Sequence, residues 1–104
     1  MQQITVQELK SRQDAGENII LVDVREDHER EEYNIGGIHH KLGDIQNMDT
    51  EALDGFKDKE VVIYCRSGKR SLNACLILES LGFENVVNLE GGILAWKEEI
   101  DNQA

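Results

Sequence analysis

The stretch Val61-Val62-Ile63-Tyr64-Cys65-Arg66-Ser67-Gly68-Lys69-Arg70-Ser71 decides the fold of this chain, because it joins an apolar run to a cationic loop and a helix. The run before Cys65 predicts a buried strand over residues 60–65. Residues 71–81 carry apolar side chains at helical spacing and predict a helix, which Gly82 ends. This order places Cys65 at the carboxyl end of a strand, where sheets of the α/β class carry their functional sites.

The segments that precede this stretch also alternate between helix and strand. Thr5, with Glu8 three residues later, has the pattern of a capping box, so we expect a helix from there to about Asp14. The near-continuous apolar run over residues 19–24 is typical of a strand that is buried on both faces of a parallel sheet. We therefore expect a helix followed by a buried strand in this part of the chain.

Weaker patterns fill the rest of the chain. Asp27 is expected to cap a short acidic helix that ends near Tyr33. Residues 39–56 predict a loop with one or two helical turns, and residues 86–89 predict another strand. The last helix is predicted over residues 93–100, with three apolar side chains on one stripe at helical spacing.

Strands that alternate with helices predict an α/β fold of three layers, α/β/α, around a central, mostly parallel sheet. Right-handed crossovers place the loops that follow the strands along one edge of such a sheet. With 104 residues the chain has the length of one compact domain, so we expect residues 1–104 to form a single domain.

The charge balance argues against two classes of partner. The 21 acidic residues outnumber the 11 basic ones and give a net charge of −10, which opposes binding to nucleic acid and to an anionic membrane surface. The first residues lack the pattern of a secretory signal, and no apolar stretch is long enough to span a bilayer. We therefore expect a cytoplasmic protein that interacts with neither membrane nor nucleic acid.

Three of the basic residues, Arg66, Lys69 and Arg70, lie within five positions of one another beside Cys65. On their own they would be compatible with a solvated surface turn. Next to a candidate nucleophile they predict a local anion site.

Cys65 has the setting of a nucleophile. A thiol at the end of a buried strand faces the N–H groups of the next turn and the N-terminus of the next helix, which stabilise the thiolate together with nearby cations. We therefore expect its pKa to lie below the ordinary value of about 8.5. Gly68 allows a positive φ, so that successive N–H groups converge, and Ser71 is placed either to cap the helix or to donate to a sulfur carried on Cys65.

Other reactive side chains have simpler interpretations. Cys75 lies among apolar residues of the predicted helix, so burial is favoured over a role as a resolving thiol. His28, His39 and His40 have no Cys or carboxylate at the spacing of metal ligands, so no metal site is predicted. Trp96 is expected to anchor the last helix in the core.

Three motifs in this order resemble the single-domain rhodaneses, a family of sulfurtransferases. Residues 21–26 (Leu-Val-Asp-Val-Arg-Glu) are similar to the first signature of that family, and residues 65–71 resemble its active-site loop. Residues 81–83 (Leu-Gly-Phe) with 91–96 (Gly-Gly-Ile-Leu-Ala-Trp) resemble its closing signature. The resemblance covers residues 4 to about 100 and implies a sheet of about five short strands.

The chain departs from the common pattern of that family after its acidic helix. Residues 34–45 read Asn-Ile-Gly-Gly-Ile-His-His-Lys-Leu-Gly-Asp-Ile, where the family commonly has His-Ile-x-Gly-Ala followed by a proline. This is closer to the variant in rhodanese domains fused to ubiquitin-like-protein activating enzymes. Residues 39–45 are therefore candidates for either a pocket wall or a partner surface.

The resemblance implies sulfur transfer through a persulfide on Cys65. The thiolate would take the outer sulfur of a small anionic donor such as thiosulfate, and a thiol or cyanide would then accept that sulfur. Such a reaction needs no metal and no organic cofactor, and a sulfur-relay protein is a further candidate partner. The substrate-binding residues would be those of the loop, with the two guanidinium groups orienting the donor: Arg66, Ser67, Gly68, Lys69, Arg70 and Ser71.

Asp23 and Arg25 occupy the charged positions of the first signature. One interpretation places them against the substrate. The interpretation we favour is a charged hydrogen-bonded pair that holds neighbouring loops and supports the site.

Two other functions compete with catalysis of sulfur transfer. Tyrosine-phosphatase-like and arsenate-reducing enzymes also carry a Cys loop that ends in Arg, but four residues separate Cys65 from Arg70, one fewer than in those loops. The tighter ring suits a sulfur atom better than a phosphoryl group. A rhodanese module that carries sulfur or binds a partner with little turnover is the second alternative, and the intact Cys65 loop argues against it. The sequence leaves open the physiological donor and acceptor, the pathway and the oligomeric state.

Overall fold

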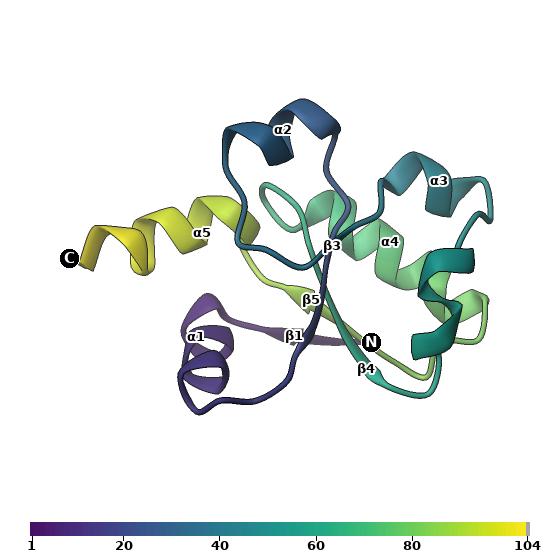
Figure 1. Cartoon of the computed structure of the whole chain (residues 1–104), viewed down its shortest axis with the longest axis horizontal. Coiled ribbons are helices and arrows are strands. Elements are labelled where there is room, and N and C mark those ends of the chain that lie inside the picture. Colours follow the sequence, from purple (N-terminus) through teal and green to yellow (C-terminus); the bar gives the residue numbers. More distant parts are fainter. Residues whose placement is uncertain (104) are drawn as a thin grey trace.

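The computed structural model describes residues 1–103 and shows a five-stranded sheet with helices on both faces (Figure 1). The strands follow the order β1-β5-β4-β2-β3 and pair in parallel throughout. The predicted three-layer α/β architecture is confirmed. The strands are β1 (Gln2–Ile4), β2 (Ile20–Asp23), β3 (Ile38–His39), β4 (Glu60–Tyr64) and β5 (Asn85–Leu89).

The helices divide between the two faces of the sheet. In Figure 1, α1 and α5 lie to the left of the strands, whereas α3, α4 and the 3-10 helix η1 lie to the right, and α2 lies above the sheet. The helical segments are α1 (Val6–Asp14), α2 (Asp27–Glu32), α3 (Leu42–Gln46), η1 (Glu51–Phe56), α4 (Lys69–Ser80), α5 (Gly92–Glu99) and the 3-10 helix η2 (Asp101–Gln103).

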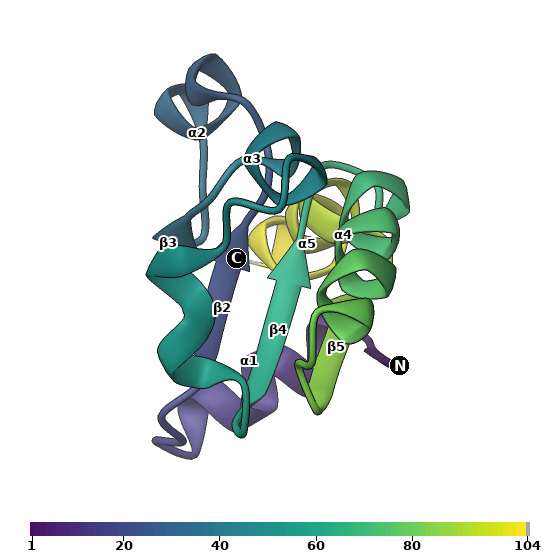
Figure 2. The ribbon, with the colours of Figure 1, turned by 90° about the vertical axis from the view of Figure 1, so that its right-hand side faces the viewer.

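Alternate side chains of the central strands point to opposite faces of the sheet and contribute to two separate hydrophobic cores. Figure 2 shows β2, β4 and β5 side by side behind α4 and η1. On that face, Val61 and Ile63 pack with side chains of α4, among them the fully buried Cys75 and Leu78. On the other face, β4 packs with residues of α1 and α5, including Trp96, as predicted for the last helix. Cys65 continues the series of Val61 and Ile63, so its side chain points toward α4.

Local signals fix several helix ends. Thr5 and Glu8 form the predicted capping box of α1. At the end of α4, Gly82 has a φ of 98° and the N–H of Phe83 donates to the carbonyl of Leu78 at 3.1 Å, which is the Schellman pattern. The prediction that Asp27 caps α2 is wrong by one residue, because Glu26 is the N-cap.

The carboxyl ends of three neighbouring strands gather the candidate residues at one edge. Asp23 is the last residue of β2, Cys65 follows β4 directly, and Asn88 is the penultimate residue of β5. Ile63 pairs with Asn88 on one side and with Val22 on the other, so these strand ends are level. Within residues 1–103, no helix has both the length and the apolar character needed to cross a bilayer.

Candidate active site

The thiol of Cys65 lies in a ring of hydrogen-bond donors. The N–H of Gly68 is 3.1 Å from Sγ, and both the N–H and the hydroxyl of Ser71 lie at 3.4 Å. Gly68 has a φ of 99° and is the N-cap of α4, so its amide turns toward the sulfur as predicted. Cys65 itself has no exposed surface.

The two cysteines of the chain have opposite electrostatic environments. Burial raises the pKa of the Cys65 thiol, but the Ser71 hydroxyl and the amides of Ser71, Gly68 and Ser67 outweigh it, and the net pKa is lowered. Burial, with a smaller contribution from the charge of Glu79, raises the pKa of Cys75 to about 12. The expected direction for Cys65 is confirmed, with hydrogen bonds as the principal cause.

Ser71 is shared between the thiol and a buried amide. It is the third residue of α4, so the alternative that it caps the helix is wrong. Its hydroxyl lies within hydrogen-bond distance of Cys65 Sγ and also of Asn88 Oδ1. Asn88 is 2% exposed, and its Nδ2 donates to the carbonyl of Gly68 at 3.2 Å. Sequence reasoning missed Asn88, although an amide within the apolar strand 86–89 was a usable signal.

The N-terminus of α5 fixes the other side of the loop. The N–H groups of Ile93 and Leu94 donate to the carbonyls of Cys65 and Arg66, both at 3.0 Å. A Cβ on Gly92 would lie 2.4 Å from the Cys65 carbonyl oxygen and 2.8 Å from that of Arg66. The close approach of the helix to the loop therefore requires glycine at position 92.

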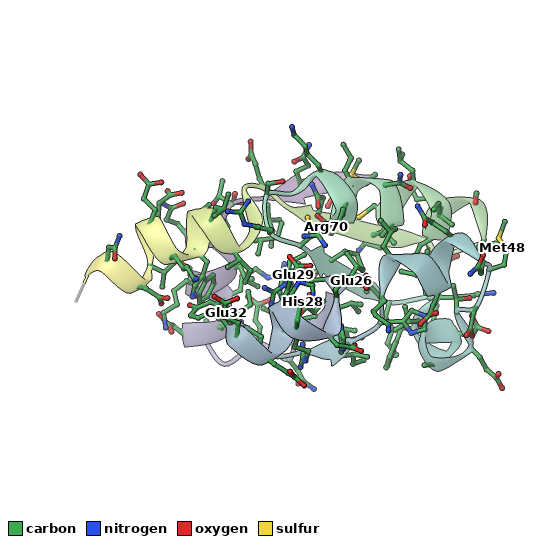
Figure 3. The ribbon with its side chains drawn as sticks, turned by 90° about the horizontal axis from the view of Figure 1, so that it is seen from above. Glu26, His28, Glu29, Glu32, Met48 and Arg70 are labelled. Carbon is green, nitrogen blue, oxygen red and sulfur yellow. The ribbon has the colours of Figure 1, made fainter. Side chains whose placement is uncertain are left out.

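The cations of the loop have different surroundings. Arg66 and Lys69 are exposed, as is Ser67. Arg70 instead donates from both terminal nitrogens to the two carboxylate oxygens of Glu29 in α2, at 2.7 and 2.8 Å (Figure 3). The hydrogen bond from Arg70 is the largest cause that lowers the pKa of Glu29, to about 2. No pattern in the sequence indicates this pairing.

Asp23 and Arg25 form the hydrogen-bonded pair that we favoured. Arg25 Nε donates to Asp23 Oδ1 and Nη2 to Oδ2, both at 3.0 Å, and both side chains are buried. Arg25 Nη2 also donates to the carbonyl of Tyr33 at 2.7 Å, while Arg30 reaches Asp23 at 3.2 Å. The pair thereby ties the end of β2 to α2 and to the segment that follows it. Arg30 also belongs to this hydrogen-bonded group, and the sequence did not indicate its participation.

A cavity of about 300 Å³ lies beside the loop, between residues of the α2 region and α5. Arg66 reaches it from the loop, whereas Cys65 does not line it. Neither do residues 39–45: His39 belongs to β3 and its Nε2 lies 2.7 Å from the carbonyl oxygen of Arg25. The lining residues are Arg25, Glu29, Glu32, Tyr33, Arg66, Ile93, Leu94 and Lys97.

The histidines do not form a metal site in the described part of the chain. Across residues 1–103, no group of three or more His, Cys, Asp or Glu side chains is arranged to hold a metal ion. His40 Nε2 instead lies 2.6 Å from the carbonyl oxygen of Asp49.

Comparisons with known proteins agree with this geometry. A family model described as a rhodanese-like domain matches residues 5–99. A Bacillus subtilis protein named "Putative sulfurtransferase YtwF" is 45% identical over 100 residues, which cover 95% of this chain and 93% of that protein. A Schizosaccharomyces pombe protein named "Putative thiosulfate sulfurtransferase, mitochondrial" is 36% identical over 94% of this chain and 77% of its own length.

The solved structures include a rhodanese-like domain protein from Staphylococcus aureus. It superimposes with a TM-score of 0.80 at 32% identity and covers 96% of this chain and 95% of its own. The sheet, the loop after β4 and the similarity over nearly the whole length lead to the same assignment. The chain belongs to the rhodanese-like domain family, and the two relatives above are named as sulfurtransferases.

Proposed function

We propose that this protein transfers sulfane sulfur through a persulfide on Cys65. The observation that carries the proposal is the convergence of three donors, from Gly68 and Ser71, on a thiol whose pKa they lower. A thiolate held in this way is the nucleophile that sulfur transfer requires.

The reaction consists of two displacements. In the first, the Cys65 thiolate attacks the outer sulfur of thiosulfate, the S–S bond of thiosulfate breaks, and sulfite leaves with the bonding pair. In the second, cyanide or a thiolate attacks the outer sulfur of the persulfide and regenerates the Cys65 thiolate. Each step moves negative charge beside amides that are already oriented, so the donors stabilise it without rearranging.

Access to the sulfur sets a further requirement. Because Cys65 has no exposed surface, the donor enters where the loop is open to solvent, at Arg66 and Ser67, and their side chains move aside for attack. Thiosulfate is the donor with which we test this transfer, since Arg66 offers an exposed guanidinium and one relative carries thiosulfate in its name.

Persulfide formation is tested by intact mass. The protein is incubated with thiosulfate and its intact mass is measured. It is then treated with cyanide, and the thiocyanate released is assayed. We expect one added sulfur atom, lost on cyanide treatment with thiocyanate released. Cys65→Ala should gain none, and Cys75→Ala, which removes the thiol with the raised pKa, should behave as wild type.

Other outcomes would replace the proposal. A sulfur gained but released with little turnover identifies a carrier, and no gain at all identifies a module without this chemistry. Hydrolysis of an aryl phosphate that disappears in Cys65→Ser would instead indicate a phosphatase.

A further inference from the structure

The ion pair between Arg70 and Glu29 changes the charge that the loop presents. Arg70 is the second residue of α4 and the last cation of the segment 65–71, and Glu29 reaches it from α2, 41 residues earlier in the chain. The pair is partly shielded from water, with 36% of the Arg70 side chain and 18% of the Glu29 side chain exposed. Its two parallel N–H···O contacts have the bidentate form in which arginine binds carboxylates most strongly.

This pair is electrostatically coupled to the thiol. The hydrogen bond that Arg70 donates to Glu29 is the largest cause that raises the pKa of Arg70, burial opposes it, and the charge of Cys65 raises it further. Glu29 also lines the cavity that Arg66 reaches from the loop. A charge at either end of the pair is therefore felt by a substrate that approaches Cys65.

Glu29 neutralises the charge of Arg70 but leaves some N–H groups of Arg70 free to donate. A guanidinium has five N–H groups, and Glu29 accepts from two of them. Three remain for a substrate, but the pair has no net charge. An approaching dianion thus meets a neutral ion pair where the sequence predicts a free cation.

We propose that Glu29 determines the donor specificity of this site: by holding Arg70 in an ion pair, it disfavours dianionic donors such as thiosulfate relative to singly charged ones such as organic persulfides. This inference rests on the proposed sulfur transfer at Cys65. Glu29 acts through Arg70 and is a positioning residue.

The first test uses alkylation of Cys65 by iodoacetate, an anion, and by iodoacetamide, a neutral reagent of similar size. In Glu29→Gln, the new amide oxygen still accepts from the amide of Glu26, a contact of 3.1 Å that caps α2. The matched control is Glu31→Gln, which removes the same charge from an exposed position of the same helix. We expect the iodoacetate-to-iodoacetamide rate ratio to rise about two- to fivefold in Glu29→Gln, the range for a partly exposed ion pair.

Steady-state kinetics give a second readout. The KM for thiosulfate should fall by the same factor in Glu29→Gln, with kcat unchanged, while the KM for an organic persulfide donor should change less. Equal alkylation ratios in Glu29→Gln and Glu31→Gln would overturn the proposal. An equal increase in the rates of iodoacetate and iodoacetamide in Glu29→Gln would also overturn the proposal. That result would mean that Glu29 limits the access of any reagent to Cys65 and does not act through its charge.

A double-mutant cycle keeps the test decisive if Glu29→Gln folds poorly. Arg70→Gln leaves the carboxylate unbalanced and should lower the rate ratio, whereas the double variant carries neither charge and should return near the wild-type ratio. If the double variant Glu29→Gln/Arg70→Gln reacted with iodoacetate as slowly as Arg70→Gln, Arg70 would attract anions directly, whether or not Glu29 is charged. That result would reject the inference. If wild type formed no persulfide, the sulfur-transfer proposal would fail, yet the alkylation ratios would still report on Glu29.

Discussion

At the scale of single residues, the ionisation of Cys65 depends on neutral donors. The hydroxyl of Ser71 is the largest of the groups that lower its pKa, ahead of the three backbone amides. The amides are fixed by the path of the chain, so the hydroxyl is the one donor that a substitution removes without rebuilding the loop.

Ser71→Ala should therefore shift the pH dependence of Cys65 alkylation. Loss of a donor to the thiolate raises its pKa, so the rate at pH 7 should fall about tenfold while the plateau at high pH is retained. Iodoacetamide rates measured between pH 5 and 10 check this. Ser67→Ala, which removes only an exposed hydroxyl and keeps the amide, should follow the wild-type profile. An unshifted profile in Ser71→Ala would contradict the assigned cause.

Residues close in sequence to Cys65 were predictable, and those brought to it by the fold were not. The strand–loop–helix order around Cys65 and the role of Gly68 follow from local chemistry, and the structure places them as expected. Glu29 meets Arg70 only through the placement of α2 above the sheet edge, which no local pattern encodes. The prediction that Arg70 is available to orient the donor lacked that contact.

At the scale of elements, the packing of α5 against the loop depends on Gly92. Its φ is 52°, and a Cβ there would collide with backbone carbonyl oxygens that have no freedom to rotate away. The first N–H groups of α5 hold those same carbonyls. The start of α5 and the loop after β4 are therefore held together as one rigid unit.

Gly92→Ala should destabilise the protein and disturb the site together. The left-handed backbone and the overpacking each cost energy, with a sum of about 2–4 kcal/mol in the free energy of unfolding. Urea unfolding and Cys65 alkylation measure the two effects. Gly43→Ala is the matched control, because nothing lies within 4 Å of a Cβ added there. Gly43 belongs to α3, and alanine favours a helix more than glycine does, so the free energy of unfolding should be unchanged or slightly higher. Equal stability of the two variants would refute the role given to Gly92.

Element ends were predicted better than short elements. Thr5, Glu8 and Gly82 carry cap chemistry that acts within a few residues, and the helices begin and end where those residues indicate. β1 and β3 have three and two residues, too few to display a period, and they exist because a neighbouring strand offers hydrogen-bonding groups. Such edge strands follow from the sheet and not from their own sequence.

At the scale of the whole molecule, excess negative charge opposes compactness. A net charge of −10 is confined to a body of 40 × 29 × 18 Å. At an ionic strength of about 0.01 M the Debye length is about 30 Å, so carboxylates repel one another across the entire protein. Surface ion pairs such as that of Arg12 with Glu17 attract at short range and individually contribute little.

The melting temperature should accordingly rise when NaCl increases from about 0.01 M to about 0.15 M, because screening weakens long-range repulsion more than contact pairs. Differential scanning fluorimetry at fixed pH measures this. Sucrose at matched osmolality is the control for non-ionic effects. A melting temperature that falls with salt would show that attractive pairs dominate the electrostatics of the folded state.

The alternation of strands and helices allowed the layers and the parallel sheet to be predicted, because each apolar run needs cover on both faces. The position of α2 was not predictable, because its place above the sheet involves tertiary contacts such as that of Glu29 with Arg70. The contribution of residues 39–56 was not predictable either, because they lack a clear period, yet Ile45 and Leu53 are buried in the core beside α4.

A hydroxyl carries a single hydrogen, and that of Ser71 has two acceptors within reach, the sulfur of Cys65 and the side-chain oxygen of Asn88. Rotation about one C–O bond is enough to transfer its donation from one acceptor to the other. In the sulfur transfer that we propose, the bare thiolate would need that hydrogen more than a persulfide whose charge has moved to the outer sulfur atom. In the proposed reaction the hydroxyl would therefore turn toward Cys65 in one half-reaction and toward Asn88 in the other, with no movement of the Ser71 oxygen itself.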